Sequence, residues 1–479
     1  MKGKVLSNML WRFAERFGAY LVSFVVSIVL ARILGPEAYG TIALITVFTT
    51  ILQVFVDSGL GNALIQKKNA DNIDFSTVFY TNIVFCLVLY TILFFCAPLI
   101  ANFYNNQELV VLTRVLGLTI IISGIKNIQQ AYVSKHLLFK KFFFATLAGT
   151  IGAAIVGILM ALNGYGVWAL VAQQLFNLTV DSLILWITVK WRPIKAFSFK
   201  RLKGLFSYGW KLLASSILDT VYNNIRQLII GKKYSSNDLA FYNKAKQFPN
   251  IIVMNINSSI DSVLLPTMSK EQDDKEKVKN MTRRAIKTSV YIMAPLMMGL
   301  AFTGNNVIEL LLTDKWLPCV PFLYIFCITY MFYPIHTANL NAIKAMGRSD
   351  LFLKLEIIKK VVGIILLLCT MNISVMAMAY SLLASCILSQ IINSWPNRKL
   401  LNYGYWQQLK DIFPSVLLSV IMGLFAYSVN YLGLSLIITL IIQVVISIVI
   451  YVGLSKVLKI DTFNYLLEII KGFKKKKVK

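Results

Sequence analysis

The stretch YGWKLLASSILDTVYNNIRQLIIG, residues 208–231, has the length of a membrane-spanning helix and an aliphatic face, yet it contains Lys211, Asp219 and Arg226. At 100° per residue, these three charges and Tyr222 fall within an arc of roughly 80°. The charges extend over about 22 Å of helix axis, so they cannot all reach the headgroups, and Asp219 is predicted near mid-membrane. A spanning helix with one wet face indicates a membrane protein with an internal polar route.

The composition of the whole chain supports a membrane protein. Its 479 residues are 57% hydrophobic and 14% charged, and the mean hydropathy is +0.68. A soluble protein of this length would expose too much apolar surface. About fourteen runs are apolar and long enough to cross a bilayer as helices, so we predict an all-α polytopic membrane protein. These runs are roughly 10–34, 40–66, 75–101, 107–133, 141–162, 166–189, 205–231, 238–267, 285–312, 319–343, 350–371, 373–395, 407–430 and 433–456.

The basic residues that give the net charge of +27 are divided unevenly between two sets of loops. One alternating set of loops, with both chain ends, holds most of the 48 Lys and Arg residues, and the opposite set holds Lys232, Lys233 and Lys315. The positive-inside rule then places both termini in the cytoplasm, in a multi-pass protein of the inner (cytoplasmic) membrane. Lys126 and Lys287, near inward helix ends, are interpreted as further topology residues. The charge therefore indicates attraction to lipid headgroups, and we predict no nucleic-acid partner.

Two similar segments suggest an internal repeat. ILGPEAYGTIALITVF begins at Ile33 and IIGKKYSSNDLAFYNKAKQF begins at Ile229. Their offset of roughly 200 residues is the length of six spans, and repeated six-helix halves are common in transporters, with the substrate site between them. The outward loops are too short for a catalytic domain. The predicted parts are a six-helix lobe at 1–195, a second at 196–400, two additional spans at 401–456 and a basic cytoplasmic tail at 457–479.

Several other spans also have one polar face. Because an intramembrane charge is costly, such faces normally line a protein interior or a water-filled cavity. Two alternatives stay open: Arg12 could reach the headgroups from its helix end, and Asp57 could form a structural ion pair. The polar faces comprise Arg12 and Arg16 on the first span, Gln53 and Asp57 on the second, Gln173, Asn177 and Asp181 on the sixth, and Lys246, Asn250, Asn257 and Asp261 on the eighth.

We predict a substrate-binding cavity from these residues. Cations would contact an anionic substrate, acids would couple to an ion or hold the cations, and neutral groups would line the route. The cations are Arg12, Arg16, Lys211, Arg226 and Lys246, the acids are Asp57, Asp219 and Asp261, and the neutral lining is Gln53, Asn177, Tyr222 and Asn257. Walker A, dinucleotide and metal-ligand patterns are absent from the sequence. We therefore predict a protein that is not an enzyme and needs no cofactor or metal.

The segments LARILGPEAYGTIALITVF, VDSGLGNALIQ, GYGVWALVAQQL and FSYGWKLLASSILDTVYNNIRQLIIGKKYSSNDLAFYNKAKQFP give the chain a family resemblance. It resembles the polysaccharide-transporter (Wzx-type) flippases of the multidrug/oligosaccharidyl-lipid/polysaccharide exporter superfamily, and it is similar to colanic-acid and teichuronic-acid exporters. The resemblance implies fourteen helices: two six-helix lobes in a V shape and two C-terminal helices. It also implies a central cationic cavity, in which Arg12 and Arg16 match the first-helix arginines in kind.

The function implied by the resemblance is transport for exopolysaccharide or lipopolysaccharide biosynthesis. Undecaprenyl-diphosphate-linked oligosaccharide would be flipped from the cytoplasmic to the outer leaflet by alternating access. The implied partners are this lipid-linked oligosaccharide, membrane lipids, and the polymerase and chain-length machinery. The alternative is a multidrug or other amphiphile exporter, which should have an acidic or aromatic pocket. The sugar, the oligomeric state and the coupling to protons, sodium or membrane potential are left open by the sequence.

Overall fold

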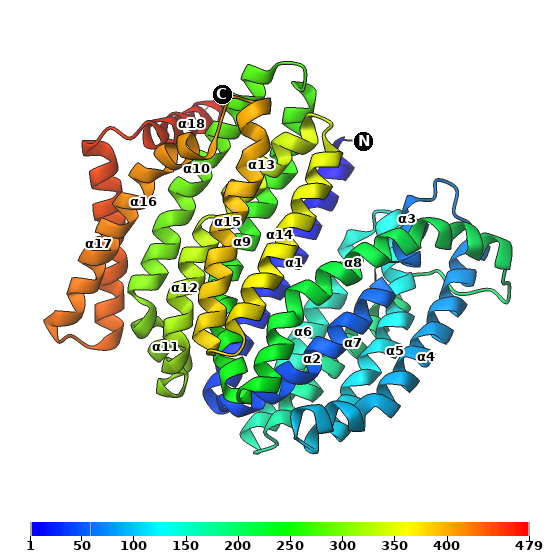
Figure 1. Cartoon of the computed structure of the whole chain (residues 1–479). Helices are drawn as coiled ribbons and strands as arrows, with labels where there is room; N and C mark the ends of the chain where they lie inside the picture. Colours follow the sequence, from blue (N-terminus) through cyan, green and yellow to red (C-terminus); the bar gives the residue numbers. More distant parts are fainter. Residues whose placement is uncertain (1, 58, 478–479) are drawn as a thin grey trace. The chain divides into compact units, whose positions relative to one another are not determined.

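A computed structural model describes residues 2–57 and 59–477, and every regular element in these two ranges is helical (Figure 1). The helices form two compact units. The first contains the residues up to Ala240 and the second begins at Phe241. The predicted all-α class is therefore confirmed.

The first unit contains eight complete helices and the beginning of a ninth. They are α1 (Lys2–Ile33), α2 (Pro36–Asp57), α3 (Leu60–Gln66), α4 (Asn72–Tyr104), α5 (Glu108–Lys135), α6 (Phe139–Leu162), α7 (Val167–Thr188), α8 (Phe199–Lys233) and the start of α9 (Ser236–Lys270).

The second unit contains the rest of α9 and all later helices. These are α10 (Lys275–Phe302), α11 (Gly304–Leu312), the 3-10 helix η1 (Asp314–Cys319), α12 (Val320–Met331), α13 (Tyr333–Ala345), α14 (Ser349–Thr370), α15 (Val375–Leu400), α16 (Tyr405–Ser428), the 3-10 helix η2 (Val429–Leu432), α17 (Leu436–Val457) and α18 (Asp461–Lys477).

Eleven helical segments in the described residues are long and apolar enough to cross a membrane. The other three of the fourteen predicted runs are also helical, as α1, α8 and α14. Charged side chains lower the apolar character of α8 and α14: α8 carries the polar stripe, and α14 includes Lys354, Glu356, Lys359 and Lys360. The chain is a polytopic helical membrane protein.

The division between the units falls within α9, later in the chain than the lobe boundary predicted at residues 195–196. The reason is that α8 packs against α2, α3 and α4, so it belongs to the first unit by contact. The boundary at residues 195–196 was placed by counting six spans for each predicted repeat. That the chain contains two six-helix repeats stays a prediction.

The two similar segments form two similar turns. α1 ends at Ile33 and α2 begins at Pro36, while α8 ends at Lys233 and α9 begins at Ser236. The turns lie against each other, because a Cβ atom added at Gly40 would be 2.0 Å from the Ser236 carbonyl oxygen. Only glycine allows so close a backbone approach.

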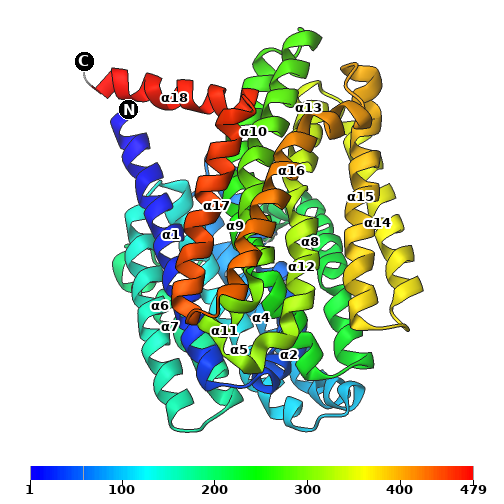
Figure 2. The ribbon, with the colours of Figure 1, turned by 90° about the vertical axis from the view of Figure 1, so that its left-hand side faces the viewer.

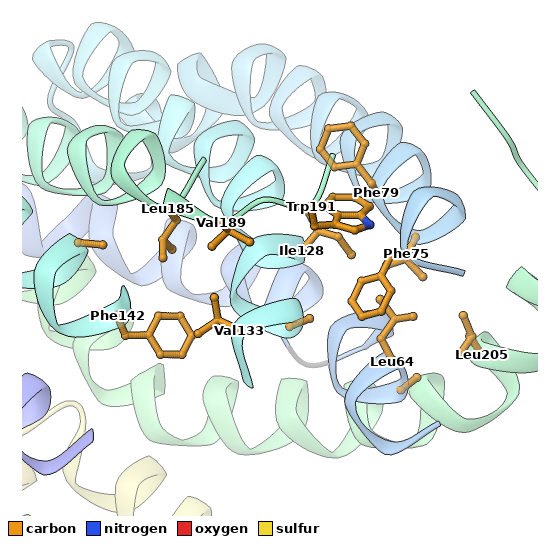
Figure 3. Close-up of a cluster of buried hydrophobic side chains, with 14 residues drawn as sticks. Leu64, Phe75, Phe79, Ile128, Val133, Phe142, Leu185, Val189, Trp191 and Leu205 are labelled. Atoms are coloured by element: carbon orange, nitrogen blue, oxygen red, sulfur yellow. The ribbon is translucent and has the colours of Figure 1, made fainter. Parts of the chain in front are cut away.

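A cluster of buried aromatic and aliphatic side chains lies in the first unit (Figure 3). Trp191, which follows α7, lies 5.8 Å from the Phe75 ring and 6.2 Å from the Phe79 ring. Around it pack buried aliphatic side chains from α3, α5, α7 and α8. The segment between α7 and α8 is basic in sequence, yet its Trp191 anchors it in a core.

Polar contacts hold the same segment on the start of α4. The Ile194 N–H donates to Ser76 Oγ at 3.0 Å, and the Ser198 N–H donates to Thr77 Oγ1 at 3.1 Å. Arg201 forms an ion pair with Asp71, the residue that caps α4. The guanidinium of Arg201 lowers the pKa of Asp71 to about 2.

Three buried amides join three helices of the second unit. Asn339 of α13 and Gln408 of α16 exchange hydrogen bonds of 2.8 and 3.0 Å. Asn397 of α15 donates to Asn339 Oδ1 at 2.7 Å. None of the three side chains is more than 2% exposed, so the trio replaces water with mutual hydrogen bonds.

Candidate functional site

A polar cavity of about 660 Å³ lies inside the first unit, between α2, α5 and α7. It brings together Gln53 and Asn177, which were predicted as polar lining, and Asp57, which was predicted as an ion-coupling or structural acid. Several threonines of α2 and α5 add hydroxyl groups to its wall. The cavity has the amide and hydroxyl lining that suits a hydrated or sugar-like ligand.

A buried ion pair lies beside this cavity. Lys126 Nζ is 2.5 Å from Asp181 Oδ2, and the side chains are only 13% and 7% exposed. Lys126 also lines the cavity itself. The lysine predicted to serve topology is thus the buried partner of an acid on the sixth predicted span.

Asp57 stands at the exposed end of a chain of amides. Its carboxylate accepts from Gln53 Nε2 at 3.2 Å and from Asn127 Nδ2 at 3.3 Å. Asn127 in turn accepts from Asn82 Nδ2 at 3.4 Å. Among the described residues the hydrogen-bond partners of Asp57 are amides, and the alternative of a structural ion pair stays a prediction.

Close packing between α6 and α7 determines the position of α7 beside the cavity. A Cβ atom at Gly149 would be 2.9 Å from the Asn177 carbonyl oxygen and 3.0 Å from its Oδ1 atom. A Cβ atom at Gly152 would be 2.6 Å from the Phe176 ring. Both glycines are therefore positions at which α6 packs closely against α7.

Sequence reasoning missed the contribution of α5. Thr119, Ser123, Lys126 and Gln130 all line the cavity. Their spacings of four, three and four residues follow one face of a helix. The same stripe argument that selected the other spans would have found this one, had Lys126 not been assigned to topology.

The opening stretch lies on α8, and its charges differ in burial. Lys211 and Asp219 are exposed, Tyr222 is half-buried and Arg226 is 7% exposed. Among the described residues, the Nε and Nη2 groups of Arg226 have no hydrogen-bond partner. A buried cation with two unsatisfied donors is costly, and such groups are often functional.

The predicted residues of the eighth span belong to the second unit. Lys246 and Asn257 are half-buried on α9. Asp261 accepts a 2.9 Å hydrogen bond from Asn341 of α13, a residue that is 1% exposed. This bond ties α9 to α13 and gives Asp261 a structural role beside any role in transport.

The remaining predicted cations are Arg12 and Arg16, whose side chains lie outside the described residues. Within the part of the chain that is described, no group of three metal-ligating side chains occurs.

These features define a polytopic helical membrane protein with a polar cavity and buried charges, an arrangement typical of transporters. Residues 29–321 match the family described as "Polysaccharide biosynthesis protein". The chain belongs to this family, which confirms the resemblance predicted from the sequence.

Two curated relatives and one solved structure are similar to this chain over most of its length. The chain is 25% identical to the teichuronic acid biosynthesis protein TuaB of Bacillus subtilis (strain 168), over 80% of each chain. It is 22% identical to the lipopolysaccharide biosynthesis protein WzxC of Escherichia coli (strain K12), over 75% of this chain and 73% of the relative. The structure of the lipid II flippase MurJ, in an inward closed conformation, aligns with a TM-score of 0.74 and 18% identity, covering 95% of this chain and 99% of that one. The chain is thus a polytopic membrane protein of the polysaccharide-biosynthesis family, with a fold similar to that of MurJ.

Proposed function

We propose that this protein flips an undecaprenyl-diphosphate-linked oligosaccharide from the cytoplasmic to the outer leaflet by alternating access. Family membership and the flippase-like fold support a lipid-linked substrate. The observation that carries the proposal is Arg226, a buried cation with two unpartnered N–H groups among the described residues of α8. The diphosphate linker is the anionic part of the proposed substrate, and it is the group that Arg226 would bind.

The expected chemistry is replacement of phosphate hydration by charge-assisted hydrogen bonds. Arginine offers paired donors that match phosphate oxygens. Lys211 and Lys246, with Arg12 and Arg16, would supply further positive charge along the route. The hydroxyls and amides around Gln53 and Asn177 would accompany the sugar, while the polyprenyl chain stays in lipid.

The membrane potential can drive the outward step. One elementary charge moved through 100 mV changes the free energy by about 2.3 kcal/mol. An anionic headgroup leaving an inside-negative cell therefore moves downhill. Asp57, Asp219 and Asp261 are the proposed acids through which a proton or sodium ion would couple to the same step.

We further place the protein in the inner membrane with both termini in the cytoplasm, since its basic loops are predicted on that side. No chemical reaction is needed, and delivery to a polymerase and chain-length machinery would follow. The multidrug alternative gains no support from the charge of the cavity between α2, α5 and α7, whose lining includes both Asp57 and Lys126 and so has no acidic excess. The observation on the side of that alternative is another cavity of the first unit, of about 560 Å³, which aromatic side chains such as Phe55, Phe85 and Trp210 line.

The test uses purified full-length protein in liposomes with a fluorescent undecaprenyl-diphosphate oligosaccharide. Arg226→Gln should slow flipping at least about tenfold, because charge-assisted hydrogen bonds contribute about 1.5–3 kcal/mol. Lys200→Gln removes the same charge from an exposed position on the same helix and should transport normally. A folded Arg226→Gln variant that flips at the original rate would remove the phosphate-binding role. Transport of cationic drugs in place of the lipid would favour the alternative exporter.

A further inference from the structure

A second polar cavity, of about 570 Å³, lies in the second unit, away from the residues assigned to transport. Its lining includes three cations of α10, Arg283, Arg284 and Lys287. Thr462 and Tyr465 of α18 form the other side. The cavity therefore combines clustered positive charge with hydroxyl donors from a different helix.

The cations around the cavity exceed the acids that face them. Asp411 of α16 binds Arg283 through two hydrogen bonds of 2.6 and 2.7 Å, and its carboxylate is also 3.3 Å from Lys287. One carboxylate is thus shared by two cations. Asp461 is the acid in the cavity lining. Three cations against two acids leave one positive charge in excess.

Arg284 is held in a way that preserves its donors. Its Cζ atom lies 4.0 Å from the centre of the Tyr465 ring, so the guanidinium stacks on the aromatic face. Stacking engages the face of the guanidinium, while its N–H groups point outward in the plane. The tyrosine therefore positions an arginine whose edge can still bind an oxyanion.

The cavity lies where the apolar part of the unit ends. α17, which is long and apolar enough to cross a membrane, ends at Val457, and α18 then runs across the end of α17 (Figure 2). Along α10, polar residues extend to Lys287 and the apolar run follows. α18 contacts both α10 and α17. The cations are thus at the level of lipid headgroups, where tyrosine is also favoured.

We propose that this cavity binds the phosphodiester of an anionic phospholipid headgroup, with α18 as its outer wall. Basic pockets between spanning helices on the cytoplasmic side are suited to such headgroups, and α18 lies at the membrane surface from which the lipid would enter. The bound lipid would be a resident component, different in place from the transported one. The proposal does not depend on the proposed flipping function.

The experiment compares lipids retained by the purified full-length chain, measured by native mass spectrometry after exchange into phosphatidylglycerol or phosphatidylcholine. We expect retention of phosphatidylglycerol over phosphatidylcholine. Arg284→Gln and Lys287→Gln should each lower that retention about fivefold, equivalent to about 1 kcal/mol per charge near the surface. Lys275→Gln, an exposed change of equal charge on the same helix, should leave it unchanged. Arg284→Lys, which keeps the charge, should retain most of the lipid.

Further arms separate the lipid from free phosphate and from loss of folding. Each variant is compared only as monodisperse protein, and phosphatidylglycerol should raise the unfolding temperature of the parent chain more than inorganic phosphate does. If inorganic phosphate stabilises equally and displaces the lipid, the cavity takes free phosphate and the lipid proposal is wrong. Equal retention of both lipids by the parent chain, or unchanged retention in both glutamine variants, would also overturn it.

Discussion

The ion pair between Lys126 and Asp181 leads to a sharp prediction for stability. The side chains of Lys126 and Asp181 are only 13% and 7% exposed, and their charged atoms are 2.5 Å apart. Removing one partner leaves the other charge buried and uncompensated, which costs about 3–5 kcal/mol. For a unit of about 240 residues, each kcal/mol lowers the unfolding temperature by roughly 2–4 °C. Lys126→Met or Asp181→Leu should therefore unfold about 10 °C earlier than the parent chain.

The double variant, with both substitutions, should recover most of that loss, because two apolar side chains of similar volume can replace a buried pair at little cost. The measurement is thermal unfolding of purified protein in one detergent, with the double-mutant cycle evaluated from the four proteins. Lys68→Met, at an exposed position, serves as the matched control and should change stability by less than about 0.5 kcal/mol. Single variants as stable as the parent, or a double variant no better than either single one, would refute the reasoning.

Three further predictions use the same unfolding assay. Gly40→Ala should lower the unfolding temperature by several degrees, because the added methyl would overlap the Ser236 carbonyl oxygen at 2.0 Å; an unchanged temperature would mean that the two turns separate freely. Gly149→Ala should both destabilise the protein and impair transport, since the methyl pushes α7 away from α6, and normal transport would contradict the coupling to the cavity. Arg201→Gln should be less stable than the parent above pH 4, and the difference should vanish as the pH falls toward 2. The sign follows because the folded pKa of Asp71 is lowered from 3.8 to about 2, so the pair's stabilisation exists at high pH and is lost on protonation; a difference independent of pH would exclude this ion pair as its source.

The sequence predicts the helical fold well because hydropathy and helix length are local properties. Each of the fourteen runs forms helix in its described residues, and 238–267, the most polar of them, became α9. Three runs are divided into two helices: 40–66 into α2 and α3, 285–312 into α10 and α11, and 319–343 into α12 and α13. What hydropathy could not provide is the contact pattern. Trp191 sits in a segment that looks like a basic linker, yet tertiary packing makes it the centre of an aromatic core. Similarly, α8 joins the first unit through its contacts with earlier helices.

For the candidate site, periodicity selected Gln53, Asp57 and Asn177, which line one cavity. On α7 the predicted face also included Gln173, which packs toward Gly157 of α6, while Gln174 lines the cavity. It could not pair Lys126 with Asp181, because these residues lie 55 positions apart and the pairing depends on how α5 packs on α7. Nor could it rank the charges on α8, of which Arg226 is buried and Lys211 exposed. Periodicity predicts on which side of a helix a residue lies, whereas its burial depends on which other helices pack against that side.

The trio of Asn339, Asn397 and Gln408 has a consequence for how this family can vary. Asn339 bonds to both of the other amides, and replacing any one of the three leaves further buried donors or acceptors without partners. Replacing all three with apolar residues of similar size would leave none, and this end state can be as stable as the original. Evolution would then cross between the two solutions only through unstable intermediates. Homologous chains should therefore inherit the three positions as a block, all amide or all apolar, and the block would mark lineages within the family.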